Sequence, residues 1–240
     1  RLGLLALLSL FTLGFARLLT YLSLQTTLVP TSSLIYLVPH AFAVLMAAIL
    51  INGGAALALG FWCSFATAVY FDQSFSVFVL GMFTTVTATT AARNVHRRSS
   101  LYKAGLWIAG VNILFACIIA IFNQPSLIIL AEQLISALVS AALATILTLL
   151  FIPLFEKCFR ITTDITLLEL SDMGHPLLQK MAIQAPGTYH HSLMVATLAQ
   201  NAAETIGANS LMVRVCAYYH DIGKMAKPDS FSENTQRGNN

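Results

Sequence analysis

The sequence predicts an all-α protein: a polytopic bundle of about six membrane-spanning helices, followed by the start of a smaller all-helical domain. Apolar residues make up 57% of the 240 residues and charged residues only 10%, whereas soluble domains carry roughly a quarter charged residues. The mean hydropathy is +0.76. The 13 basic and 10 acidic residues are unevenly placed, since eight of them lie in 1–155 and the other fifteen in 156–240. The chain therefore has a lipid-compatible part and a water-compatible part.

Six apolar stretches have lengths that suit the hydrocarbon core of a membrane. They are roughly 2–23, 34–51, 54–71, 74–92, 104–122 and 127–155. Helices of this composition lack polar faces, which argues against a soluble helical core. The last stretch would reach about 43 Å as a helix, against a membrane core near 30 Å. We therefore expect this helix to continue beyond the membrane, with Pro153 marking or bending its exit.

Positive charges predict the orientation of these spans. The segment 93–103 is the only strongly basic loop between them, and basic loops stay on the cytoplasmic side. Counting spans from this loop places Arg1 and the whole region after residue 155 in the cytoplasm. The first span carries Arg17, which either snorkels to the interface or lines the bundle interior.

Two further polar residues in the apolar stretches receive structural interpretations. Glu132 lies near the outer end of its span and is interpreted as a solvated interfacial carboxylate rather than a functional one. His40 is interpreted as a packed or hydrogen-bonded histidine. Because the spans show neither paired charges nor broken helices, a transporter is the weaker interpretation of the bundle.

The water-compatible part begins with short, capped helices. Thr163 is expected to cap a helix over 164–171. Thr188 is expected to cap a longer helix that Gly207 ends. Asn209 or Ser210 is then expected to cap the next helix, which leads to a His-Asp doublet.

Histidines and one carboxylate in these helices carry the chemistry. His190 and His191 are expected in the first turn of one helix, and His220-Asp221 at the end of the next, three residues before Lys224. Imidazoles and a carboxylate suit Mn²⁺, Fe²⁺ or Zn²⁺. A carboxylate can bridge two ions that activate water for phosphoryl displacement, and a lysine can neutralise a phosphate oxygen. Since such residues are also common on surfaces, spacing alone leaves open a metal site and an exposed cluster.

The longer pattern resembles a known family. The strings TYHHSLMVA (188–196) and HDIGK (220–224) resemble the HD phosphohydrolase superfamily. Further matching strings are LLELS (167–171), HPLL (175–178) and APGT (185–188). With several spans directly upstream, the chain resembles the seven-transmembrane HD-domain (HDIG) family of the cyclic di-AMP phosphodiesterase type. The resemblance is strong over about 163–236 and rests on architecture before that.

The resemblance implies a membrane-anchored phosphodiesterase that opens cyclic di-AMP to the linear dinucleotide in bacterial second-messenger signalling. It implies that His191, rather than His190, joins His220 and Asp221 as metal ligands, and that Lys224 adds to this catalytic set by contacting phosphate. For His190 a supporting role and mere surface exposure both stay open. The implied cofactors are two divalent transition-metal ions, Mn or Fe, at an HD domain on the cytoplasmic face of the bacterial inner (cell) membrane.

The expected organisation is a transmembrane bundle over 1–155, cytosolic linker helices over 156–187 and the N-terminal part of an HD domain over 188–240. Members of the family carry an extracellular domain, a seventh span, and later histidines and an aspartate. We therefore expect a longer protein, of which these 240 residues alone are inactive.

The expected partners are a cyclic dinucleotide and the lipid bilayer, with a homodimer as an option. A net charge of +3 is too small to indicate nucleic acid. Two alternatives remain: hydrolysis of another nucleotide, such as cyclic di-GMP or a guanosine alarmone, and a membrane receptor or scaffold that binds nucleotide without cleaving it. Adenine preference rests on family analogy alone.

Overall fold

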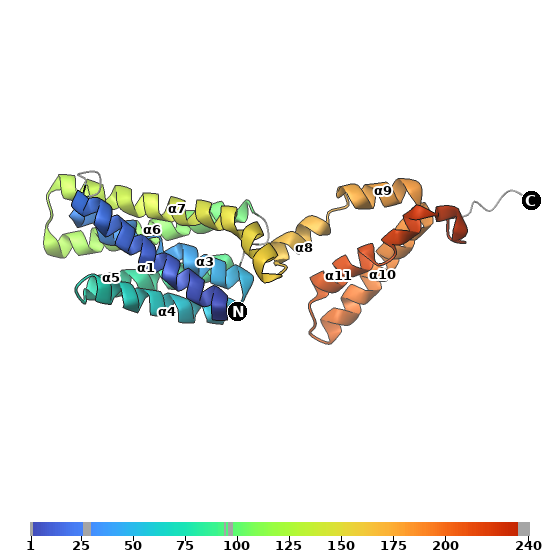
Figure 1. Ribbon diagram of the computed structural model, residues 1–240, viewed down its shortest axis with the longest axis horizontal. Coiled ribbons are helices and arrows are strands. Elements are labelled where there is room, and N and C mark those ends of the chain that lie inside the picture. The colour runs from blue at the N-terminus through green and yellow to red at the C-terminus, as the bar shows by residue number, and fades with distance from the viewer. Residues whose placement is uncertain (1, 26–29, 94, 96–97, 235–240) are drawn as a thin grey trace, which may run out of the picture. The chain divides into compact units, whose positions relative to one another are not determined.

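The computed structural model describes residues 2–25, 30–93, 95 and 98–234 of the chain; Arg1 and the Arg97 of the basic loop lie outside these. All regular elements within the described residues are helices, which confirms the all-α class (Figure 1). The chain divides into two compact units, Arg1–Ile161 and Thr162–Asn240. Each unit is described by itself.

The first unit is a bundle whose helices are long and apolar enough to cross a membrane. Its elements are α1 (Leu2–Gln25), η1 (Thr31–Ser33), α2 (Leu34–Leu37), α3 (His40–Leu50), α4 (Gly53–Tyr70), α5 (Phe75–Ala92), α6 (Ser100–Asn123) and α7 (Leu127–Phe159). Together they supply six candidate spans within the described residues, as expected. The 33 residues of α7 exceed the roughly 20 that a bilayer needs. Pro153 lies inside this helix, which continues past it to Phe159.

The second span is broken, contrary to expectation. It consists of η1, α2 and α3, and the helix is interrupted at Val38 and Pro39. Proline lacks an N–H donor and disfavours helical backbone at the residue before it, which explains the break at this position. His40 follows the break and is buried, and its Nδ1 has no hydrogen-bond partner among the described residues. The packed interpretation of His40 is thus supported, whereas the absence of broken helices no longer argues against a transporter.

Small residues allow the helices of the bundle to approach closely. A Cβ on Gly60 of α4 would overlap the side chain of Thr85 on α5. A Cβ on Gly81 of α5 would lie 2.5 Å from the Oγ of Ser64 on α4. Buried hydroxyls in this region donate to carbonyls one turn earlier, such as Ser64 to Gly60 at 2.7 Å. Transmembrane helices associate through close packing of this kind, because lipid provides no hydrophobic gain for it.

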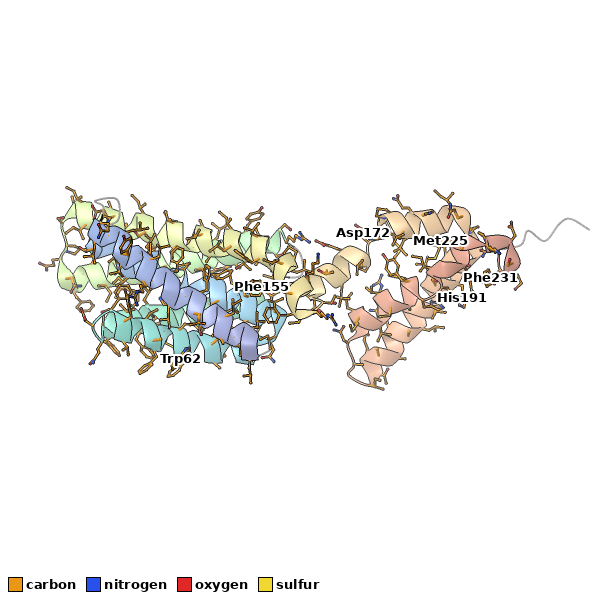
Figure 2. The ribbon with its side chains drawn as sticks, viewed as in Figure 1. Trp62, Phe155, Asp172, His191, Met225 and Phe231 are labelled. Atoms are coloured by element: carbon orange, nitrogen blue, oxygen red, sulfur yellow. The ribbon has the colours of Figure 1, made fainter. Side chains whose placement is uncertain are left out.

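The outward face of the bundle is apolar and suits lipid. Large side chains such as Trp62 and Trp107 are more than half exposed. Figure 2 shows Trp62 on the outside of the bundle. Arg17 is exposed and lies along an outward groove with Trp62 and Tyr70, which favours snorkelling over a place in the interior. Glu132 is partly buried and accepts a hydrogen bond from Ser32 Oγ at 3.2 Å, so it packs against the second span rather than being solvated alone.

The second unit is a set of short helices around a small core. Its elements are α8 (Asp164–Leu170), α9 (Pro176–Gln184), α10 (Pro186–Thr205), α11 (Ser210–Tyr219), η2 (Ile222–Ala226) and η3 (Pro228–Ser230). Leu178, Met181, Ala196, Ala217 and Tyr218 are among the residues of its buried core.

Three predicted boundaries of these helices are confirmed and one is wrong. The side chains of Thr163 and Asn209 accept from backbone N–H groups at the starts of α8 and α11, and Gly207 adopts a left-handed φ of +68° after α10. Thr188, however, is not an N-cap. It is the third residue of α10, because Pro186 takes the first helical position, where its missing N–H costs nothing.

Candidate metal centre

Two neighbouring helices bring the site together. Helices α10 and α11 are joined by a short turn and pack against each other as an antiparallel pair, so the start of α10 lies beside the end of α11 (Figure 1). Because α10 begins at Pro186, His191 lies in its second turn rather than the expected first. His220 is the C-cap of α11, and Asp221 follows it.

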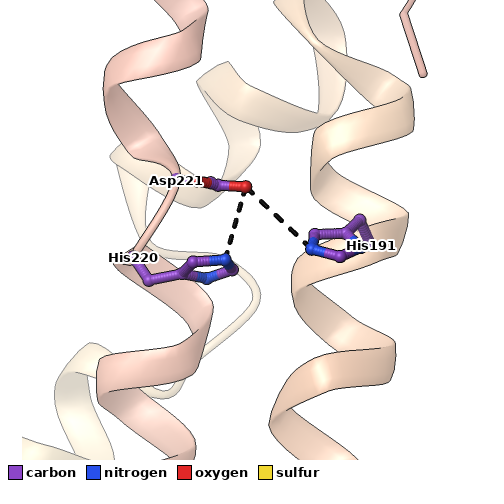
Figure 3. A group of neighbouring side chains, drawn as sticks. All are labelled: His191, His220 and Asp221. Atoms are coloured by element: carbon purple, nitrogen blue, oxygen red, sulfur yellow. Dashed lines mark ion pairs between the residues drawn. The ribbon is translucent and has the colours of Figure 1, made fainter. Parts of the chain in front are cut away.

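The side chains of His191, His220 and Asp221 converge (Figure 3). The Asp221 Oδ2 lies 3.3 Å from His220 Nε2 and 4.0 Å from His191 Nε2. One candidate ligand atom from each of the three residues lies within 4.8 Å of the other two. Nitrogen and oxygen ligands stand about 2.0–2.2 Å from a transition-metal ion, so a small contraction would let one ion reach all three. The geometry agrees with the residues that the resemblance implies; their role as ligands stays a prediction.

Local contacts orient the imidazole of His220. Its Nδ1 lies 2.8 Å from the carbonyl oxygen of Ala217, one turn earlier in α11. A hydrogen bond from Nδ1–H to a carbonyl fixes the tautomer and leaves Nε2 without a proton, so that its lone pair is free to ligate a metal ion. His220 and His191 are 39% and 50% exposed, so solvent and substrate have access to both rings.

Lys224 is part of the same cluster. Its Nζ lies 2.9 Å from Asp221 Oδ2 and 2.7 Å from Glu233 Oε1, and 4.9 Å from the ring centre of Phe231. The hydrogen bond from Lys224 is the main reason that the pKa of Asp221 lies below its usual range. The same bond, followed by the one to Glu233, raises the pKa of Lys224, and Lys224 in turn lowers the pKa of Glu233. These three groups are therefore charged at neutral pH.

His190 does not belong to the cluster. It is exposed, and its ring lies edge-on to that of Tyr189 with 5.8 Å between the ring centres. Of the two possibilities left open by the sequence, this arrangement favours surface exposure.

Sequence reasoning missed a polar network beside the cluster. Asn234 and Thr188 exchange two hydrogen bonds, and Glu233 binds Lys224. Glu233 follows Lys224 by nine residues, and the 3₁₀ helix η3 lies between them, so no helical or strand period indicates their contact. The identity of Gly187, next to Thr188, was the available signal, since glycine often marks a close approach of backbone.

Two imidazole nitrogens and a carboxylate form a donor set that suits a divalent transition-metal ion. Three protein ligands leave further positions for water and a substrate oxygen. A lysine ammonium beside such a site adds a positive charge for an anionic substrate. These groups are of the kinds that metal-assisted hydrolysis of a phosphoester uses.

Comparison with family models gives two matches that together cover most of the chain. Residues 1–163 match the model described as 7TM receptor with intracellular HD hydrolase, and residues 188–240 match the HD domain model. HD domains are metal-dependent hydrolases.

Comparison with curated proteins gives relatives that are much longer. The chain is 36% identical over 215 residues to the cyclic-di-AMP phosphodiesterase PgpH of Listeria monocytogenes, which covers 87% of this chain and 30% of that protein. It is 32% identical over 207 residues to the PgpH of Bacillus subtilis, covering 83% of this chain and 29% of that protein. An uncharacterised Synechocystis protein is 47% identical over 88 residues. The chain thus spans less than a third of the length of the two PgpH proteins. No solved structure gives a significant match.

Proposed function

Since the chain belongs to the family of 7TM receptors with an intracellular HD hydrolase, we propose that the intact protein is a membrane-anchored, metal-dependent phosphodiesterase. One observation carries the proposal: Asp221 Oδ2 lies between the imidazoles of His191 and His220, which come from different helices. Three side chains that could ligate a metal ion converge here, and they are the residues that the resemblance implies.

The proposed ligands are His191 and His220 through Nε2, and Asp221 through its carboxylate. Asp221 has two oxygens, so it can bridge two ions, and Mn²⁺ or Fe²⁺ fits a site of nitrogen and oxygen donors. When bound, such ions activate a water molecule and stabilise the charge that develops in phosphoryl displacement. Ligands beyond these three would come from other parts of the intact protein.

The protein side chains have distinct proposed roles. The contact between His220 Nδ1 and the Ala217 carbonyl fixes the orientation of the imidazole, so that Nε2 points to the site. Lys224 holds its ammonium next to Asp221 Oδ2, where it can bind a non-bridging phosphoryl oxygen. Both imidazoles are partly exposed, which permits a substrate as large as a dinucleotide to approach.

The proposed substrate is cyclic di-AMP, opened to the linear dinucleotide, because the PgpH proteins of Listeria and Bacillus are named for this activity. The proposed location is the inner (cell) membrane of a bacterium, with the HD domain on the cytoplasmic side, as the basic loop after α5 indicates. The proposed organisation is a bundle over 1–155, linker helices over 156–187 and the beginning of the HD domain over 188–240.

The test is hydrolysis by the full-length protein in detergent, with Mn²⁺ or Fe²⁺ and after chelation. Cyclic di-AMP, cyclic di-GMP and a guanosine alarmone are supplied separately, and products are separated by chromatography. We expect metal-dependent conversion of cyclic di-AMP to the linear dinucleotide. Tight binding without turnover would contradict the proposal and support a receptor, whereas turnover of another nucleotide would correct the substrate. Sizing the same sample decides whether the optional homodimer forms.

A further inference from the structure

A short segment after η3 contacts the start of α10. In the segment Phe231–Asn234, here called the latch, Asn234 Oδ1 accepts from the Thr188 backbone N–H at 3.0 Å. Asn234 Nδ2 donates to Thr188 Oγ1 at 2.8 Å. Thr188 is fully buried and lies three residues before His191, on the same side of α10. The latch therefore binds the first turn of α10, directly before the turn that carries His191.

Gly187 makes this contact possible. A Cβ at residue 187 would overlap the backbone carbonyl oxygen of Glu233. The atoms that a Cβ would meet belong to the backbone of Glu233, so rotation of a flexible side chain could not relieve the overlap. The close approach explains why a glycine stands between Pro186 and Thr188.

The latch also reaches the other half of the cluster through Lys224. Glu233 Oε1 lies 2.7 Å from Lys224 Nζ, and the Phe231 ring is close enough for a cation–π contact. Lys224 Nζ lies 2.9 Å from Asp221 Oδ2, the same oxygen that faces both imidazoles. A metal ion bound by Asp221 through Oδ2 would therefore compete with the ammonium group for one oxygen atom. Because the Glu233 carboxylate also binds the ammonium group, the interaction between Lys224 and Asp221 is weaker than it would be without Glu233.

We propose that the latch is a positioning device of the metal centre, in which Glu233 competes with Asp221 for the Lys224 ammonium while Asn234 fixes the first turn of α10, directly before His191. This inference rests on the proposed function, because it assumes that Asp221 binds metal. With a metal ion bound to Asp221, Glu233 would keep the Lys224 ammonium beside the site, where it could meet the substrate phosphate.

The experiment uses the full-length protein in detergent and Mn²⁺ as the probe. Glu233→Gln removes the charge that shares the ammonium, so Lys224 pairs with Asp221 alone. We expect the Kd for Mn²⁺ to rise about tenfold, at the lower end of the range for residues that support metal ligands. Glu233→Asp, which keeps the charge, should recover part of this loss. Asp229→Asn removes an exposed carboxylate from the same region and should leave the Kd within about twofold.

A double-mutant cycle separates positioning from a general effect on folding. In the Lys224→Met protein the competing ammonium is gone, so adding Glu233→Gln should barely change the Kd for Mn²⁺. An equal loss in the presence and absence of Lys224 would overturn the proposed role of Glu233.

Hydrogen exchange measured without metal distinguishes a failure of this inference from a failure of the proposed function. Hydrogen exchange at the Thr188 amide should accelerate in the Asn234→Ala protein, because its acceptor is removed. If the wild-type protein bound no Mn²⁺ while exchange still responded, the metal proposal would fail and the Asn234 contact would stand. Unchanged exchange in Asn234→Ala would overturn the latch itself.

Discussion

The membrane bundle and the second unit both bring helices into close contact, but with different chemistry. In the bundle, Gly60 and Gly81 let helices α4 and α5 meet against Thr85 and Ser64. In the second unit, Gly187 lets α10 meet the latch, and charged and polar side chains then hold the contact.

The difference follows from the solvent of each region. Lipid gives no hydrophobic reward for burying an apolar side chain between helices, so shape complementarity and backbone-directed hydroxyls must stabilise the bundle. Water competes for every hydrogen bond of the latch, so each contributes only about 1 kcal/mol net. We infer that close packing determines the structure of the bundle, whereas the geometry of the metal centre depends on a few polar contacts that a single substitution can remove.

The largest expected effect is at the centre of the polar cluster. Asp221→Asn keeps the size of the side chain but removes the charge that both imidazoles and Lys224 face. We expect kcat for the full-length protein to fall on the order of 10²–10³-fold, as when a charged stabiliser of the transition state is lost. Metal content is measured in parallel and should fall too. His190→Ala is the matched control, since His190 is exposed and outside the cluster, and a similar loss there would contradict the site.

The next effect concerns the backbone contact of the latch. Gly187→Ala forces the Glu233 carbonyl away, so Thr188 and Lys224 lose their alignment. We expect a loss of metal affinity or kcat between about 10- and 100-fold, the range for residues that support metal ligands. Gly223→Ala is the control, because a Cβ there meets nothing within 4 Å. Equal losses in the two variants would show that the close approach at Gly187 does not matter.

Local signals in the sequence predicted much of this fold. The lengths of the apolar stretches correctly predicted the six candidate spans. Thr163, Asn209 and Gly207 correctly predicted helix ends, because capping depends on residues that are neighbours in the sequence. The break at Pro39 also had a local signal, which the continuous apolar run around it obscured.

The candidate site was predictable only in part. The assignment of His191, His220 and Asp221 came from a resemblance, since spacing alone left an exposed surface cluster open as the alternative. Their convergence depends on how α10 and α11 pack, and the contact of Lys224 with Glu233 depends on two irregular turns. Such contacts join residues that are not separated by a helical or strand repeat, so the periodicity of the sequence does not predict them.

Inside the bundle, overpacking should change stability rather than activity. Gly60→Ala places a methyl group against Thr85, whose branched Cβ allows little adjustment. We expect the free energy of unfolding to fall by about 1–3 kcal/mol, the usual cost of an overpacked core. The Kd for Mn²⁺ should not change. Gly110→Ala, where a Cβ meets nothing within 4 Å, should leave stability near that of wild type. A shifted Kd in Gly60→Ala alone would reveal coupling between the two regions.

The smallest expected effect compares one hydrogen bond in each region. Thr84 donates to Asn112 Oδ1 at 2.7 Å between two spans, and Thr188 and Asn234 pair in the second unit. Double-mutant cycles with Thr84→Val and Asn112→Leu should give a coupling energy near 0.6 kcal/mol, as is typical between transmembrane helices. The corresponding cycle at Thr188 and Asn234 should give about 0.5–1.5 kcal/mol. Both are read from unfolding of the full-length protein in detergent. Because the unfolded chain in a membrane also finds polar partners, lipid should not strengthen the first pair. A coupling energy above about 2 kcal/mol at Thr84 and Asn112 would mean that polar contacts, and not packing alone, determine the bundle.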